Sequence, residues 1–238
     1  MKTLPIITSC SILLLLLFVG CQNPESGKEG LDENELNKDS LKVIEMLEHA
    51  NGLQRDDKIR YCGKIIEIAP NNPVPYRLRA IEYSWDIKKL DSAVMDCKKV
   101  VELEPNKPIN YFDLAKAQLK AKHFKDGLKS INRYFELDST YWAGYLIKAM
   151  ILSKMKRYNN SIEFLKKWPE EYMYHPEIRH ILIAENFSEL HEEDSVCYYL
   201  KSMPDIKDIS ALGVYWRKFY KLNQKYDCIP ELMDYPKE

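Results

Sequence analysis

The residues in this chain that could do chemistry are few and scattered. The stretch "HEEDS" from His191 sets one histidine beside three carboxylates, but it lacks the second histidine four residues on that a helical zinc site needs. His175 and His180 lie five residues apart and do not share a helix face. With only 8 glycines, the chain has no glycine-rich phosphate loop, no G-x-S-x-G motif and no Cys/His pair in a catalytic context. We therefore expect a protein that is not an enzyme and that holds no metal and no cofactor.

Length and composition fit one helical domain of ordinary size. The chain has 238 residues, 45% of them hydrophobic, and the low glycine content with abundant Leu, Ile, Lys, Glu and Ala favours helices. Lys and Arg number 35 and Asp and Glu 36, for a formal net charge of -1. The chain has no excess positive charge that would attract nucleic acid, so no nucleic-acid partner is expected.

The amino terminus has the pattern of an export signal. Lys2 precedes an apolar run over residues 4–19, and a polar stretch with Pro, Ser and Gly follows. The end of the run, "FVGC" (residues 18–21), resembles the lipobox of bacterial lipoproteins, with Phe18 where Leu is usual. That resemblance implies a signal peptide over residues 1–20 and lipidation of Cys21, and it implies an envelope protein held in a membrane by its lipid. Since Gln22 rather than Asp follows Cys21, the outer membrane is favoured.

An uncleaved membrane anchor is the alternative, although the apolar run is at the short limit for spanning a bilayer. Residues 21–38 are polar, charged and contain Pro and Gly, so we interpret them as a flexible tether.

The rest of the chain repeats itself at a nearly fixed interval. Tyr76, Tyr111 and Tyr145 are each followed four residues later by an alanine, and a small–aliphatic pair opens the second helix of each unit. The last two copies are spaced by 34 residues throughout, and one extra residue separates the front halves of the first two, within "WDIKKL". Small residues at such places let two helices cross closely.

This helix-turn-helix period resembles the tetratricopeptide repeat (TPR). The resemblance implies an all-α, right-handed superhelical solenoid of about five TPR-like repeats over residues 39–238. Weaker copies flank the three central ones, with a first helix near 39–50 and later copies after residue 178, as expected for terminal repeats that meet water. An irregular helical bundle is the alternative, but it would not reproduce four residue classes at a fixed spacing.

Four cysteines fall within the repeats. Cys62 and Cys97 occupy the same place in adjacent units, where neighbouring helices are too far apart for a disulfide, and we interpret both as small apolar core residues. A bridge between Cys197 and Cys228 is possible but is the less favoured interpretation.

In proteins of this kind, the first helices of successive repeats line a concave groove. Counting from each tyrosine places nine candidate partner-binding residues on that face: Arg77, Ile81, Trp85, Phe112, Lys116, Lys120, Leu146, Met150 and Lys154. The mixture of apolar side chains and cations favours a protein or peptide segment as the partner. Two alternatives stay open, that Trp85 packs into the turn and that the lysines form only a solvated face.

The resemblance thus implies a lipid-anchored scaffold or adaptor of the bacterial envelope that binds proteins through its groove, with a membrane as second partner through Cys21. A surface lipoprotein that binds glycans or small solutes through some of its 16 tyrosines and 4 tryptophans is the alternative. Most of these aromatic residues fall at core positions of the repeat, which favours the scaffold.

Overall fold

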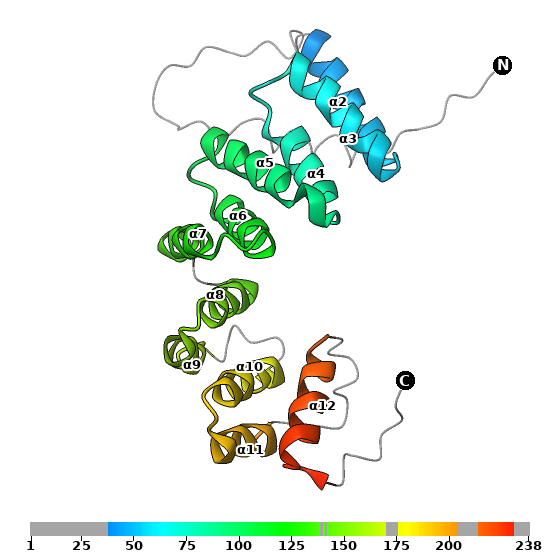
Figure 1. The fold of residues 1–238 in the computed structure, drawn as a ribbon. Helices are drawn as coiled ribbons and strands as arrows, with labels where there is room; N and C mark the ends of the chain where they lie inside the picture. The colour runs from blue at the N-terminus through cyan, green and yellow to red at the C-terminus, as the bar shows by residue number, and fades with distance from the viewer. Residues whose placement is uncertain (1–37, 139, 141, 170–175, 204–213, 231–238) are drawn as a thin grey trace, which may run out of the picture. The chain divides into compact units, whose positions relative to one another are not determined.

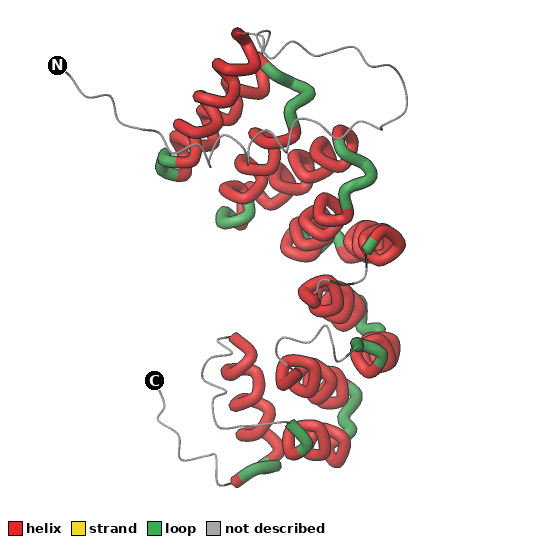
Figure 2. The backbone as a smooth tube through the Cα atoms, turned by 180° about the vertical axis from the view of Figure 1, so that it is seen from behind, coloured by secondary structure: helices red, strands yellow, loops and turns green. Residues whose placement is uncertain are grey.

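The computed structural model describes residues 38–138, 140, 142–169, 176–203 and 214–230. By its contacts the chain divides into a unit of residues 1–41, of which only the start of one helix is described, and a compact unit of residues 42–238. The described residues form helices and loops without a strand (Figure 2). The helices are α2 (Lys38–Asn51), α3 (Arg55–Ile68), α4 (Pro73–Tyr83), the 3-10 helix η1 (Ile87–Lys89), α5 (Leu90–Leu103), α6 (Pro108–Lys120), α7 (Phe124–Leu137), α8 (Trp142–Lys154), α9 (Tyr158–Lys166), α10 (Pro176–Glu189), α11 (Glu193–Lys201) and α12 (Val214–Tyr226).

The helices form consecutive hairpins, and each helix from α3 onward packs on its neighbours in sequence (Figure 1). Two pairs of successive first helices also pack on each other, α6 on α8 and α10 on α12, and α12 packs on α11 as well. This arrangement confirms the predicted all-α solenoid of helix pairs. The pairs α4–α5, α6–α7 and α8–α9 are the three central repeats, and α12 occupies the place of the first helix of a further repeat.

Prolines and an asparagine set several of the helix boundaries. Pro73 and Pro108 begin α4 and α6, where a missing N–H costs nothing. The side chain of Asn72 accepts a hydrogen bond of 2.9 Å from the backbone N–H of Val74 and caps α4. Pro105 lies just beyond the end of α5, since proline cannot continue a helix.

The small residues lie at the helix crossings. Ala80, Ala93, Ala115 and Ala149 are each at most 4% exposed. A Cβ atom added to Gly127 would lie 3.2 Å from Cδ1 of Ile151 and 3.6 Å from the carbonyl oxygen of Ala115. There is therefore no room for larger side chains between α6, α7 and α8, and the predicted reason for the repeat pattern holds.

We number the helix pairs from α2–α3 as repeat 1 to α10–α11 as repeat 5. A recurring turn joins the two helices of repeats 3, 4 and 5. Its residues Lys122, Lys156 and His191 have positive φ angles of 62°, 59° and 61°. The next N–H in each case donates to a carbonyl five residues back, as from His123 to Gln118 over 2.8 Å. This is a Schellman-type helix end, which glycine occupies most easily. Asp227, after α12, also has a positive φ of 52°, but here the N–H of Asp227 donates to Asn223 four residues back and the side chain of Asn223 holds the chain that follows.

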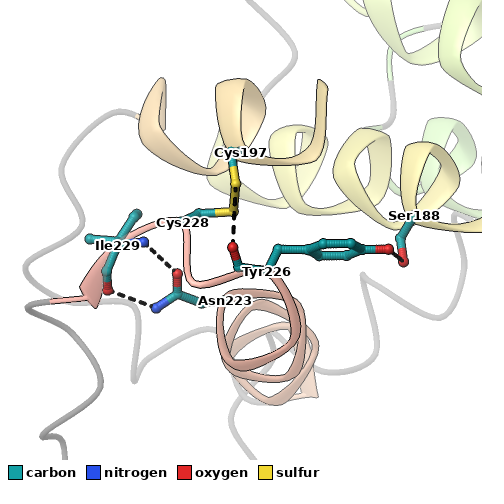
Figure 3. Close-up of a disulfide and its surroundings, with 6 residues drawn as sticks. All are labelled: Ser188, Cys197, Asn223, Tyr226, Cys228 and Ile229. Carbon is teal, nitrogen blue, oxygen red and sulfur yellow. Dashed lines mark hydrogen bonds between the residues drawn. A yellow bond between two sulfur atoms is a disulfide. The ribbon is translucent and has the colours of Figure 1, made fainter. Parts of the chain in front are cut away.

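A disulfide joins Cys197 of α11 to Cys228 just beyond α12, and their Cα atoms lie 5.0 Å apart (Figure 3). The interpretation of these two cysteines as unbridged is wrong. The physical reason is that α12 packs on α11 and then turns back at Asp227, which brings residue 228 to the neighbouring helix. Cys62 and Cys97 are buried free thiols, as expected. Burial raises the pKa of the Cys97 thiol to about 12, which keeps it protonated and unreactive.

Candidate protein-interaction surface

The nine predicted groove residues separate into buried, half-buried and exposed groups. Ile81 is 51% exposed and Trp85 66%, and Lys116, Lys120 and Lys154 are also exposed. Arg77 and Met150 are half-buried. Phe112 and Leu146, at 6% and 7% exposure, belong to the core, so their placement in the groove is wrong.

Phe112 faces the second helix of its own hairpin. The ring of Phe112 lies 6.0 Å from the ring of Tyr134 on α7. Arg77, at the equivalent place on α4, donates to Glu104 at 3.0 Å and to Asn110 at 2.9 Å. Arg77 therefore fixes the loop between α5 and α6, and its guanidinium is already engaged.

Trp85 and Lys120 form the centre of the exposed part. Trp85 is not buried in the turn, and the Lys120 ammonium lies 5.3 Å from the centre of its ring, within the range of a cation–π contact. The same ammonium donates to the carbonyl oxygen of Ser84 over 3.2 Å. Burial and, to a lesser extent, the charge of Lys116 lower the pKa of Lys120. These contacts hold a cation over an exposed indole between α4 and α6.

Lys116 lies one helical turn before Lys120 on α6. Its ammonium lies 3.5 Å from Asp113 and 5.5 Å from the centre of the buried Phe112 ring. We define the Trp85 surface as Ile81, Trp85, Lys116 and Lys120. It offers two exposed apolar side chains beside two cations.

A second part of the same helix face lies on α8, α10 and α12. Met150 and Lys154 line a small pocket together with Glu185 and Asn186 of α10 and Lys218 of α12. Lys218 pairs with Glu185 at 2.5 Å. Asn186 is buried and donates to Leu182 and Ser161, while its Oδ1 atom has no partner.

Sequence reasoning missed the residues that α10 and α12 contribute. Glu185 lies 35 residues after Met150, so extending the repeat register by one more unit would have found it. Lys218 gives no such signal, because the sequence leading to α12 keeps little of the repeat pattern.

The described residues contain no cluster of three or more metal-ligating side chains, and none of their helices is both long and apolar enough to cross a bilayer. The aromatic residues named above as repeat positions pack inside the protein. Tyr145 stacks on Trp168 with ring centres 5.3 Å apart, and both are buried. These two rings are therefore core residues.

No family model and no curated protein matches this chain. Among solved structures, the chain resembles the MamA protein, with a TM-score of 0.60 and 17% identity over 79% of this chain and 96% of that one. TTC0263, a thermophilic TPR protein of Thermus thermophilus, gives a TM-score of 0.53 and 14% identity over 74% of this chain and 98% of that one. YrrB, a TPR protein described as having an unusual peptide-binding site, gives 0.50 and 15% over 72% and 94%. At these identities the likeness shows the fold, which is a helical solenoid of TPR repeats.

Proposed function

We propose that this protein is a lipid-anchored scaffold of the bacterial cell envelope that binds a segment of another protein on the face formed by the first helices of its repeats. The observation that carries the proposal is Trp85, which is 66% exposed, has the ammonium of Lys120 over its ring and follows exposed Ile81 by four residues. Exposed tryptophans near cations are typical anchors of protein interfaces. YrrB, which shares the fold, has a peptide-binding site.

The chemistry of the surface defines the segment that it would bind. Lys116, Lys120 and Lys154 supply positive charge, and Ile81, Trp85 and Met150 supply apolar contact, so the segment should alternate acidic and apolar residues. The cations act through a screened field and should mainly set the association rate. The apolar side chains should set the lifetime of the complex.

The double variant Lys116→Glu/Lys120→Glu tests this surface. Peptides selected from a random displayed library on the unchanged protein should be rich in Asp or Glu beside aliphatic or aromatic residues. The variant should bind them about tenfold more weakly at low salt and show a smaller loss at high salt. Fluorescence polarisation with the selected peptides measures both losses.

A matched control carries the same charge change elsewhere. Lys42→Glu/Lys64→Glu reverses two exposed lysines of α2 and α3, and it should leave peptide affinity within about twofold. Selected peptides without acidic residues, or equal losses in the two variants, would show that the lysines of the Trp85 surface are only a solvated face.

The lipid anchor is tested separately. The predicted signal peptide, Cys21 and the tether up to residue 37 lie outside the described residues. Export is supported by the disulfide between Cys197 and Cys228, because structural disulfides persist mainly in oxidising compartments. Cys21→Ser should abolish metabolic labelling with a fatty acid and leave the precursor uncleaved, as read by mass on a gel. Labelling that persists in the variant would refute lipidation at this residue.

A further inference from the structure

The turns that join the two helices of each repeat lie side by side along one edge of the solenoid. His123 of the α6–α7 turn lies 3.2 Å from Asp91 at the start of α5. Residues 122–126, which span the end of that turn and the start of α7, line one open cleft together with Met155 of the α8–α9 turn and Lys98 of α5. Tyr158 donates to Glu189 at the end of α10 over 3.3 Å. Contacts therefore link the turns of repeats 2 to 5 in order.

Charge is segregated along this edge although the whole chain is nearly neutral. With the adjoining helix ends included, the α6–α7 junction reads "KAKHFK" from Lys120 and the α8–α9 junction reads "KMKR" from Lys154. The α10–α11 junction reads "ELHEED" from Glu189 and has four carboxylates and no lysine or arginine. We define the basic edge as five exposed cations: Lys98, Lys122, Lys125, Lys156 and Arg157.

The basic edge is open for a partner. The carboxylates near it that form ion pairs in the described part of the chain, Asp91 and Asp126, form them with His123 and Lys129. Half-buried Phe124 and Met155 lie in the same cleft and add apolar surface between the cations. Two of the five cations, Lys122 and Lys156, stand at the positive-φ positions where glycine would be easier. Local folding therefore does not explain why lysine is present there.

We propose that the basic edge rests on the anionic phospholipid headgroups of a membrane. Four of its five cations are lysines, which act as mobile point charges suited to a diffuse negative surface, whereas a specific phosphate site favours the fork of arginine. Lysines near a membrane surface are attracted by anionic lipids within about a Debye length. The acidic turn of repeat 5 would be repelled, so repeats 3 and 4 would lie nearest the lipid.

This inference deepens the proposed function and uses its lipid anchor for proximity. A tether over residues 21–38 reaches at most about 60 Å when fully extended, so it would keep the solenoid within that distance of the bilayer. Lipidation holds the chain at the membrane, and the basic edge would orient it there. The alternative partner is an acidic protein, which would contact the same cations. In that case the protein would bind neutral and anionic lipid vesicles equally.

The test uses the chain from residue 21 with Cys21→Ser, which carries no lipid, and sedimentation with vesicles. Vesicles of phosphatidylcholine with phosphatidylglycerol should carry the protein down, and pure phosphatidylcholine vesicles should not. The variant Lys122→Gly/Lys156→Gly should reduce the partition coefficient about tenfold or more. Its melting temperature should not fall, because glycine suits both positive-φ positions, so a loss of binding cannot come from unfolding.

Lys42→Gln/Lys64→Gln removes two exposed lysines from α2 and α3 and should lower partitioning less than about threefold. Equal binding to both vesicle types, or equal losses in the two variants, would overturn the inference. The inference would also be overturned if the protein bound no vesicles but bound a soluble acidic protein through Lys122 and Lys156. Peptide binding at the Trp85 surface and labelling of Cys21 are read in separate assays, so either can fail while the vesicle result stands.

Discussion

Phe112→Ala is expected to lower the free energy of unfolding by about 3–5 kcal/mol, and Trp85→Ala to change it by at most about 0.5 kcal/mol. Phe112 is 6% exposed and packs on Tyr134, so its loss opens a cavity between α6 and α7. Trp85 is 66% exposed and touches little that its removal would unpack. Urea denaturation of the two variants, followed by circular dichroism, measures both changes.

The same pair should behave in the opposite way in peptide binding. Trp85→Ala should lower the affinity for the library-selected peptides by at least about tenfold, because an indole that becomes buried in an interface commonly contributes more than 1 kcal/mol to binding. Phe112→Ala, measured where it is still folded, should bind them within a few-fold of the unchanged chain. Equal stability losses in the two variants would contradict the packing of α4 and α6 described above.

Helix geometry explains why the sequence placed Phe112 and Leu146 wrongly. The groove residues were counted in steps of four from each tyrosine, and four residues advance the direction of a side chain by about 40° beyond a full turn. Positions nine and one residues after the tyrosine therefore point about 80° apart. Trp85, Lys120 and Lys154 at the later position are exposed, whereas Phe112 and Leu146 at the earlier one are buried.

The repeat fold was predictable because it depends on local, repeated requirements. Alanine at a crossing and an aromatic residue at a fixed step each have a single structural reason, and the 34-residue period shows them together. The pocket on α8, α10 and α12 was not predictable in the same way. Lys218 comes from a helix that departs from the repeat, and only its packing on α10 brings it to Glu185.

The disulfide was also beyond local pattern reading. Cys197 and Cys228 are separated by 31 residues, and their spacing alone does not show that the chain after α12 reverses. The reversal depends on Asp227, which adopts positive φ, and on Asn223, which exchanges two hydrogen bonds of 2.9 and 2.8 Å with the backbone of Ile229 (Figure 3). The sequence held one signal for this reversal: "KYDC" (residues 225–228) has a polar residue two positions after a lysine, as the earlier turns do at Lys122 and Lys156.

Cys228→Ser is expected to lower the free energy of unfolding by about 3–4 kcal/mol. The bridge joins residues 31 apart in sequence, and closing a loop of that length lowers the entropy of the unfolded chain. The loss should be local to the last hairpin. α12 is held otherwise by Phe219 and Leu222 in the core, by Lys218 with Glu185 and by the hydrogen bond between Ser188 and Tyr226. Limited proteolysis should therefore cut near α12 first, while α4 to α7 stay protected.

A reducing agent supplies the matched comparison for that variant. Reductant should destabilise the unchanged chain about as much as Cys228→Ser does. It should not change the stability of the double variant Cys197→Ser/Cys228→Ser, because the remaining cysteines Cys62 and Cys97 are free thiols with no bridge to reduce. Alkylation of Cys197 and Cys228 in the unfolded, unreduced chain would show that the bridge is absent. Because α12 carries Lys218 to the pocket with Met150 and Lys154, reduction should loosen that part of the surface and leave the Trp85 surface on α4 and α6 intact.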